Sequence, residues 1–262
     1  MENYLESASE IAREAGALLL EYSRRPLEIS YKRPSDLVTE ADRSSEALIV
    51  KRLLERFPSH AVVSEEGGGQ KTASDYCWYV DPLDGTTNFA HGFPIFCVTL
   101  GLAFRGEVIA GAVYDPMRDE LFAAERGAGA YLNGKRIRVS RITRLSQSLV
   151  ATGFAPYSFD NGLNLQFFFR FTRHSHGVRR AGSAALDLCS VAAGRFEGFW
   201  ELKLNSWDKA AGSLLVTEAG GRVSDLRGRP FQLLGDQVFA SNGLVHEEMC
   251  AIFAEMLGPP QD

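Results

Sequence analysis

The stretch WYVDPLDGTTNF, residues 78–89, carries the most information about the fold. Its apolar first part is typical of a buried strand ending at Asp81, and Gly85 and the threonines after it are typical of a helix start. Asp81 and Asp84 therefore stand between a strand end and a helix N-terminus. Carboxylate and carbonyl oxygens are the ligands that Mg²⁺ prefers, and the free N–H groups of a helix start bind anions. The stretch therefore indicates a site for a divalent cation and a phosphate together.

A plain surface turn is the alternative interpretation, because Asp-Pro and Asp-Gly pairs are common turn signals. The residues before this turn, Cys77–Val80, are more apolar than a surface hairpin requires. Other carboxylates also follow predicted strands, namely Glu65 and Glu201. Asp208 opens a helix rich in small residues. It could belong to the same site, or it could be only the N-cap of that helix, where replacement by Ala costs roughly 1 kcal/mol.

Composition sets the class of protein. The chain has 262 residues, of which 45% are hydrophobic and 23% charged, and its formal net charge is -5. This is ordinary globular composition, enough for one large domain or two closely packed halves. The acidic total argues against a nucleic-acid or membrane-surface binder. The four cysteines form no C-x-x-C pair, which makes a zinc site unexpected and favours reduced thiols in the cytoplasm.

Hydrophobic periodicity predicts a mixed α/β fold. In the first half, residues 1–144, we expect helices packed on an antiparallel sheet. The second half, residues 145–262, alternates short strands with helices, which suggests βα units. The expected helices cover 3–23, 39–57, 163–171, 183–193, 208–219 and 245–257. The expected strands cover 27–31, 61–64, 76–81, 95–104, 107–114, 121–125, 149–152, 177–179, 196–200 and 238–241. Residues 32–35 are expected to form a basic loop.

These pieces together resemble the inositol monophosphatase family of Mg²⁺-dependent, lithium-sensitive phosphatases, over nearly the whole chain. The resemblance rests on five motifs in order: DLVTEAD (36–42), SEEG (64–67), WYVDPLDGTTNF (78–89), RAGSAA (180–185) and WDKAAG (207–212). It implies a layered αβαβα sandwich of the inositol monophosphatase and fructose-1,6-bisphosphatase type. Most metal ligands would come from residues 1–144, and the substrate-side loop and Asp208 from residues 145–262.

The resemblance also implies roles for individual residues. One Mg²⁺ would be bound by Glu65, Asp81 and the carbonyl of Leu83, and a second by Asp81, Asp84 and Asp208. A third, weaker Mg²⁺ would lie near Glu65. Thr86, paired with Asp42, would orient and deprotonate the attacking water, and the N–H groups of Gly85 and Thr86 would hold the phosphate. The rest of the substrate would face Gly182, Ser183, Ala184, Glu201 and Asp208, with Glu201 receiving sugar hydroxyls.

Elementary electrostatics agrees with this assignment. The carboxylates Glu65, Asp81, Asp84 and Asp208 would repel one another unless cations neutralised them. Two Mg²⁺ ions roughly 4 Å apart bind both the attacking and the leaving oxygen of an in-line displacement. None of the five histidines lies in these motifs, which disfavours a phosphohistidine intermediate.

The expected activity is hydrolysis of a small sugar or cyclitol phosphate, with myo-inositol 1-phosphate favoured by Thr86-Thr87 and Glu201. Fructose 1,6-bisphosphate, histidinol phosphate, NADP and 3′-phosphoadenosine 5′-phosphate stay open as substrates. A low-turnover regulatory protein on the same fold is the alternative from another class. The resemblance further implies a homodimer and a mobile lid at residues 32–35, where the spacing of Lys32 differs from the family pattern.

Overall fold

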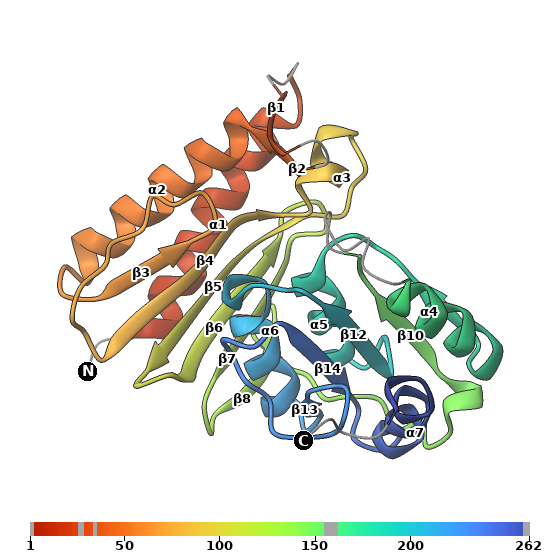
Figure 1. Cartoon of the computed structure of the whole chain (residues 1–262). Coiled ribbons are helices and arrows are strands. Elements are labelled where there is room, and N and C mark those ends of the chain that lie inside the picture. Colours follow the sequence, from red (N-terminus) through yellow and green to blue (C-terminus); the bar gives the residue numbers. More distant parts are fainter. Residues whose placement is uncertain (1–2, 26–28, 34–35, 155–161, 259–262) are drawn as a thin grey trace.

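Helices and sheets alternate in five layers in the computed structural model, which describes residues 3–25, 29–33, 36–154 and 162–258 (Figure 1). The first layer holds helices α1 (Tyr4–Tyr22) and α2 (Glu40–Arg56), which cover one face of a seven-stranded sheet. Helices α5 (Ala184–Ala192) and α6 (Ser206–Glu218) form the middle layer. A five-stranded sheet follows, and α4 (Leu163–His174) and α7 (His246–Leu257) close the stack. The predicted αβαβα sandwich is therefore confirmed.

The seven-stranded sheet runs in chain order from β3 to β9. Its first pair, β3 and β4, is parallel and every other neighbouring pair is antiparallel, as expected for the first half of the chain. The strands are β3 (Ala61–Ser64), β4 (Tyr76–Asp84), β5 (Cys97–Phe104), β6 (Glu107–Asp115), β7 (Glu120–Glu125), β8 (Gly129–Leu132) and β9 (Lys135–Arg136). The short helix α3 (Thr86–Ala90) follows β4 directly.

The five-stranded sheet has the order β11-β10-β12-β14-β13. β10 pairs in parallel with β11 and β12, while β14 is antiparallel to both of its neighbours. The strands are β10 (Leu149–Thr152), β11 (Gly177–Arg179), β12 (Gly198–Leu202), β13 (Arg222–Ser224) and β14 (Gln237–Ser241), and a 3-10 turn η1 (Leu145–Gln147) precedes them. The sequence pattern missed β13, because three residues are too few to establish a period of two.

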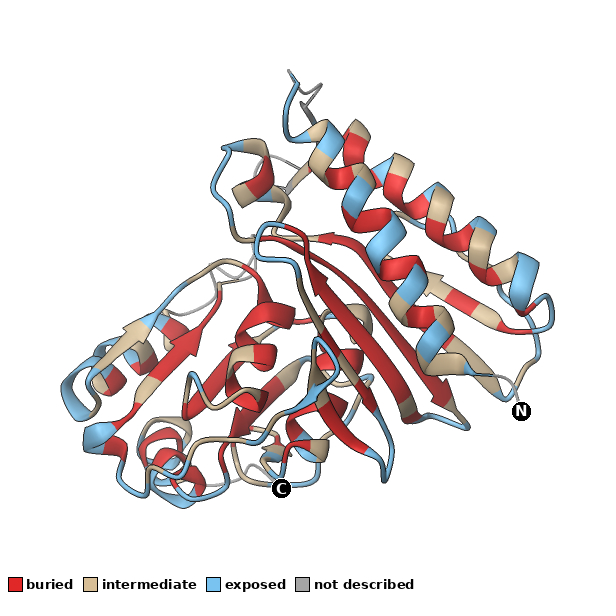
Figure 2. Ribbon diagram, turned by 180° about the vertical axis from the view of Figure 1, so that it is seen from behind, coloured by how far each residue is buried: buried red, intermediate tan, exposed pale blue. Residues whose placement is uncertain are grey.

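Among the described residues, three apolar clusters fill the spaces between the layers, and buried residues follow both sheets (Figure 2). The middle cluster joins α5 and α6 to both sheets, so the two halves of the chain share one core. The contact of α6 with the first sheet is unusually close. A Cβ added at Gly101 would lie 2.7 Å from Cβ of Ala210, and one added at Gly111 would lie 2.8 Å from Cα of Ala211. Small residues on both sides therefore bring the start of α6 against the sheet.

The structure corrects the predicted loop at 32–35. Lys32 and Arg33 belong to β1 (Ile29–Arg33), which pairs antiparallel with β2 (Asp36–Thr39). Pro34 and Ser35 of the predicted loop lie outside the described residues. Leu27 and Glu28 of the predicted strand also lie outside them. Charged residues are common on such unprotected strands, so the basic composition did not require a loop. No helix among the described residues is both long enough and apolar enough to cross a membrane.

Candidate active site

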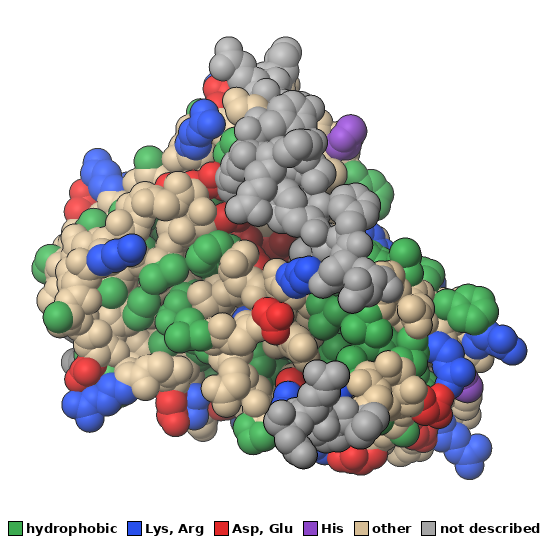
Figure 3. All heavy atoms as spheres, in the orientation of Figure 1, with side chains coloured by type: hydrophobic (Ala, Val, Ile, Leu, Met, Phe, Trp, Pro, Cys, Tyr) green, Lys and Arg blue, Asp and Glu red, His purple; other side chains and the backbone are tan. Residues whose placement is uncertain are grey.

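A cavity of about 240 Å³ lies where the end of β4 meets the starts of α5 and α6. Acidic side chains lie in the hollow at the centre of the face drawn in Figure 3. All the residues predicted for the site line this cavity except Asp42, which lies behind Thr86: Glu65, Asp81, Leu83, Asp84, Gly85, Thr86, Gly182, Ser183, Ala184, Glu201 and Asp208. The geometry therefore brings together side chains from both halves of the chain.

The end of β4 is irregular, and this irregularity shapes the site. The strand continues through Asp81 to Asp84, although the sequence pattern ended it at Asp81, and its register against β5 shifts between these two residues. Asp81 is 2% exposed, and its Oδ1 accepts a hydrogen bond of 3.0 Å from the backbone N–H of Leu83. Because the strand bulges here, Asp81 and Asp84 both line the cavity instead of alternating between faces.

Thr86 and Asp42 form a hydrogen-bonded pair at the start of α3. The Thr86 hydroxyl donates toward Asp42 Oδ1 and the Leu83 carbonyl, each at 3.0 Å. Asp42 belongs to the capping box of α2, and its Oδ2 accepts from both the N–H and the hydroxyl of Thr39. Burial raises the pKa of Asp42, while the bonds from Thr39 and Thr86 oppose that rise. Both carboxylate oxygens of Asp42 are therefore held by hydrogen bonds, and its raised pKa makes it a better proton acceptor than an ordinary aspartate.

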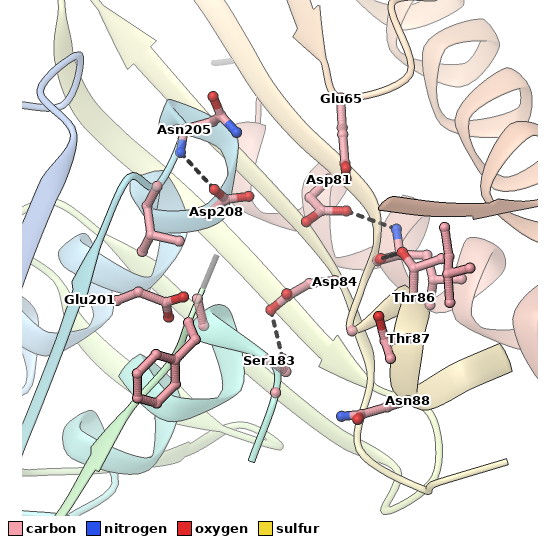
Figure 4. Close-up of a pocket in the computed structure, with 18 of the residues that line it drawn as sticks. Glu65, Asp81, Asp84, Thr86, Thr87, Asn88, Ser183, Glu201, Asn205 and Asp208 are labelled. Atoms are coloured by element: carbon pink, nitrogen blue, oxygen red, sulfur yellow. Dashed lines mark hydrogen bonds between the residues drawn. The ribbon is translucent and has the colours of Figure 1, made fainter. Parts of the chain in front are cut away.

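Asp84 connects β4 to the start of α5. Its Oδ2 accepts 2.6 Å from the hydroxyl of Ser183, the N-cap residue, and 2.8 Å from the N–H of Ala185 (Figure 4). Burial raises the pKa of Asp84 to about 6, and these two hydrogen bonds act in the opposite direction. A carboxylate beside a helix start is also favoured by the helix dipole. Ser183 therefore holds a predicted metal ligand, in addition to lining the cavity.

Asp208 lies in the first turn of α6, where it has a capping role without being the cap. The helix begins at Ser206 with Asn205 as the cap residue, and Asp208 Oδ2 accepts 2.7 Å from the Asn205 N–H. The interpretation of Asp208 as an N-cap was therefore wrong by position, although part of its hydrogen bonding does satisfy the helix start. In Figure 4 its carboxylate lies across the cavity from Asp81 and Asp84.

Glu201 faces the same cavity from β12, which ends at Leu202, two residues beyond the predicted strand end. It is 6% exposed, and its pKa is raised well above the ordinary value by burial and then by the charges of Asp187 and Asp208. The carboxylate occupies the space beside Gly153, where an added Cβ would lie 2.0 Å from Glu201 Oε2. The Glu201 carboxylate can therefore occupy this position because residue 153, directly after β10, has no side chain.

The acidic groups of the cavity raise one another's pKa through charge repulsion. Burial raises the pKa of Asp81 well above its ordinary value, and the charges of Glu65, Asp84 and Asp208 add to the rise. Burial likewise raises the pKa of Asp208, with further contributions from Asp84 and Glu65. Carboxylates that disfavour one another's charge in this way are suited to a cation, which reverses the sign of the local potential.

The donor set fits Mg²⁺, although not as a ready-made cage. Within the described parts of the chain, no three or more histidine, cysteine or acidic side chains are arranged so that they could hold a metal ion. Mg²⁺ in phosphate-processing sites is commonly held by one or two carboxylates, with water and phosphate oxygens completing its shell. Asp81 with Glu65 or Asp84 satisfies that requirement. The predicted trio of Asp81, Asp84 and Asp208 is not arranged so that all three side chains could hold one ion.

Two residues that shape the site were not singled out from the sequence. Asn88 donates 2.8 Å to the carbonyls of both Ile95 and Ala181, and thereby ties α3 to the loop before α5. Gly182 of that loop has φ +89°, and an added Cβ would lie 2.9 Å from the Asn88 amide. Asn88 follows the two threonines within the opening stretch, but nothing local reveals a partner that is 93 residues away. Gly153 was missed for the same reason.

The layering and the acidic cavity define an αβαβα sandwich of the inositol monophosphatase and fructose-1,6-bisphosphatase type. The sequence profile of the inositol monophosphatase family matches residues 1–257, and the chain belongs to that family.

Similar proteins carry two kinds of name. An inositol-1-monophosphatase of Synechocystis sp. is 44% identical, over 97% of this chain and 90% of its own length. The Nus factor SuhB of Pseudomonas aeruginosa is also 44% identical, over 92% of each chain. The crystal structure of the extragenic suppressor protein suhB from Bartonella henselae superposes with a TM-score of 0.92 at 39% identity, covering 96% of this chain and 98% of that one.

Proposed function

We propose that the protein is a Mg²⁺-dependent phosphomonoesterase that hydrolyses a small sugar or cyclitol phosphate, with myo-inositol 1-phosphate as the favoured substrate. The observation that carries the proposal is the convergence of Glu65, Asp81, Asp84 and Asp208 on one cavity, beside the Thr86–Asp42 pair. The cavity volume of about 240 Å³ also supports a small substrate, since pockets for drug-sized ligands span roughly 300–1,000 Å³.

In this proposal Mg²⁺ would be held by Glu65, Asp81, the Leu83 carbonyl, Asp84 and Asp208, two to three ions per site. When bound, it would neutralise these carboxylates and the phosphate, and lower the pKa of a coordinated water. The chain itself supplies the orientation. Thr86 donates its hydrogen to Asp42, so its oxygen lone pairs are free to accept a hydrogen bond from the attacking water.

Substrate binding would divide between the two halves of the cavity. The N–H groups of Gly85 and Thr86 would hold the phosphate at the start of α3. Glu201 would accept hydrogen bonds from hydroxyls of the leaving alcohol, beside Gly182, Ser183 and Ala184, which line the cavity with it. An ionised carboxylate accepts hydrogen bonds and cannot donate them. In its ionised form Glu201 therefore favours a polyol over an apolar or anionic leaving group. Lithium sensitivity, a homodimer and a cytoplasmic location belong to the same proposal.

The substrate is tested by measuring kcat/KM over a panel of phosphate esters. We expect myo-inositol 1-phosphate to exceed fructose 1,6-bisphosphate, histidinol phosphate, NADP and 3′-phosphoadenosine 5′-phosphate by at least tenfold, which is a difference of about 1.4 kcal/mol in transition-state binding. A higher kcat/KM for any other member of the panel would replace inositol 1-phosphate as the proposed substrate.

A second candidate is a regulatory protein on the same fold, which is favoured by the name of the Pseudomonas aeruginosa relative, Nus factor. The retained carboxylates argue against loss of turnover, because a decayed enzyme has no reason to keep four mutually repelling side chains. Absence of phosphate release from every ester in the panel would favour this candidate.

A further inference from the structure

Helix α2 presents three buried polar side chains to three different parts of the active site. Asp42 accepts from Thr86, as described above. Ser45 donates 2.8 Å to the Pro82 carbonyl, between Asp81 and Leu83. Glu46 accepts 3.1 Å from the N–H of Gly68, in the loop that follows β3 and begins with Glu65. Positions three and four apart share one face of a helix, so a single face of α2 contacts all three segments.

Glu46 is the charged member of this face that the proposed function leaves without a role. It is 7% exposed; its Oε2 meets Gly68, and its Oε1 has no hydrogen-bond partner. Placing a carboxylate in such surroundings costs free energy, which a hydrogen bond to one backbone N–H only partly offsets. An apolar residue would pack α2 at lower cost. The acid is therefore better explained by what it holds than by helix packing.

The loop that Glu46 contacts has little internal support: the Gly67 N–H donates a long hydrogen bond of 3.3 Å to the Ser64 carbonyl. Residues 67–69 are three glycines, and Gly67 has φ +87°. An added Cβ would lie 2.4 Å from Glu46 Oε2 at Gly68 and 2.2 Å from the Val62 carbonyl at Gly69, so the loop passes tightly between α2 and β3. Glycines lose the most conformational freedom on ordering. An external acceptor at Gly68 is therefore an effective means of fixing this loop.

The ends of the loop are held by backbone contacts. The Glu65 N–H donates 3.2 Å to the Val80 carbonyl, next to Asp81, and the Val62 N–H donates 2.8 Å to the Gln70 carbonyl. With Gly68 fixed by Glu46, the chain from Glu65 to Gln70 has an anchor at each end and one in the middle. The backbone of Glu65, a proposed metal ligand, lies at one end of this path.

We infer that Glu46 is a positioning residue, which holds the 65–69 loop through Gly68 and thereby places Glu65 at the cation site. The effect on the loop follows from the contacts alone, whereas the effect on Mg²⁺ rests on the proposed function. Groups that orient a metal ligand without touching the metal typically change metal affinity by about 10–100-fold when removed.

The test compares Glu46→Ala, Glu46→Asp and Glu46→Gln with the wild type by two readouts. Hydrogen exchange of residues 64–70 is measured without metal, and the Mg²⁺ dissociation constant is measured by calorimetry. In the Ala and Asp variants, which lack the acceptor or its reach, we expect faster exchange in this segment and Mg²⁺ binding weaker by about tenfold or more. Glu46→Gln keeps a side-chain oxygen that can accept from the Gly68 N–H. Its exchange rates and its Mg²⁺ affinity should therefore stay near those of the wild type.

Glu55→Ala is the matched control, because Glu55 is an exposed glutamate on the same helix, paired with Arg52 at the surface. It should change neither readout. Exchange rates and Mg²⁺ affinity equal to those of the wild type in Glu46→Ala would overturn the inference. Equal losses of protection and of Mg²⁺ affinity in the Ala and Gln variants would also overturn it, because the charge of Glu46 and not its bond to Gly68 would then be responsible. If the wild type binds no Mg²⁺, the proposed function fails, and the exchange rates alone decide the role of Glu46.

Discussion

Thr86 illustrates how single side chains divide the work within this site. Its hydroxyl donates toward Asp42 and the Leu83 carbonyl, and Asp42 is held in turn by Thr39. A hydroxyl whose hydrogen is already committed acts as an acceptor toward a third group. The burial that raises the pKa of Asp42 makes this chain of bonds more able to draw a proton away from water.

Replacing Thr86 by Ala should lower kcat by about 10²–10⁴-fold, the usual range for a positioned proton-transfer group. KM should change little, because the proposed phosphate contacts at this residue come from the backbone. Thr86→Ser keeps the hydroxyl and should retain most of kcat. Steady-state kinetics with inorganic phosphate detection measures both, and a Thr86→Ala variant with kcat near that of the wild type would remove Thr86 from the mechanism.

His246 is a buried residue whose protonation should couple the stability of the fold to pH. It is fully buried between the hydroxyls of Ser224 and Ser241 and stacks on Phe239. Burial, and then the charge of Arg222, lower its pKa from 6.5 to about 4. The unfolded chain therefore binds a proton more readily than the folded one, and the stabilisation is complete above pH 6.5 and falls as the pH decreases toward 4.

From these two pKa values, the free energy of unfolding should fall by about 2 kcal/mol between pH 7 and pH 5 through this residue. Urea unfolding of the wild type and of a His246→Gln variant at both pH values measures the difference. The variant should be less stable at pH 7 but should lose about 2 kcal/mol less on acidification. Equal losses in the two proteins would show that His246 does not titrate as described.

At the scale of elements, sequence periodicity predicted the regular parts of the fold well. Strands β3, β10 and β11 have the predicted bounds, and the helix predicted from residue 39 has Thr39 as its N-cap. These elements have clear local signals, either apolar runs between turns or a capping residue. The errors at Lys32–Arg33, at the end of β4 and at β13 have a different cause. The structure of these segments depends on their pairing with another strand. The sequence of one segment alone does not reveal that pairing.

The same distinction explains which parts of the site could be predicted. The acidic residues stand at strand ends or helix starts and within recognisable motifs. Asn88, Gly153 and Glu46 act through contacts with distant segments, so their local sequence carries no functional signal. Gly153 is a clear case, because its lack of a side chain has meaning only once Glu201 is known to occupy the space beside it.

Replacing Gly153 by Ala should therefore displace the Glu201 carboxylate. Its backbone is not in the left-handed region, and the obstructing atoms are the end of a flexible side chain, so stability should change by less than about 1 kcal/mol. KM for inositol 1-phosphate should rise by about tenfold or more, since a hydrogen bond to a charged group contributes about 1.5–3 kcal/mol. An aryl phosphate without ring hydroxyls is the control substrate; a parallel rise in its KM would contradict the role given to Glu201.

At the scale of the whole molecule, the site exists because two sheets are joined through one layer of helices. The seven-stranded sheet supplies Asp81 and Asp84, and α6, packed on that sheet through small residues, brings Asp208 from the later part of the chain. We propose residue 144 as the boundary between an N-terminal half and a C-terminal half. The shared middle core makes independent folding of either half unexpected.

Phosphate release from myo-inositol 1-phosphate, measured with and without Mg²⁺ for the wild type and for Asp84→Asn, tests the proposed metal-dependent hydrolysis. Asp84 is held by Ser183 and Ala185, and Asn keeps an acceptor oxygen, so the variant should fold with an unchanged far-ultraviolet spectrum. Its kcat should fall by more than about 100-fold, because even groups that only orient a metal ligand contribute about 10–100-fold. Phosphate release that needs Mg²⁺ and is lost in the variant is the predicted result. Release that proceeds equally without Mg²⁺, or at an undiminished rate in folded Asp84→Asn, would contradict it.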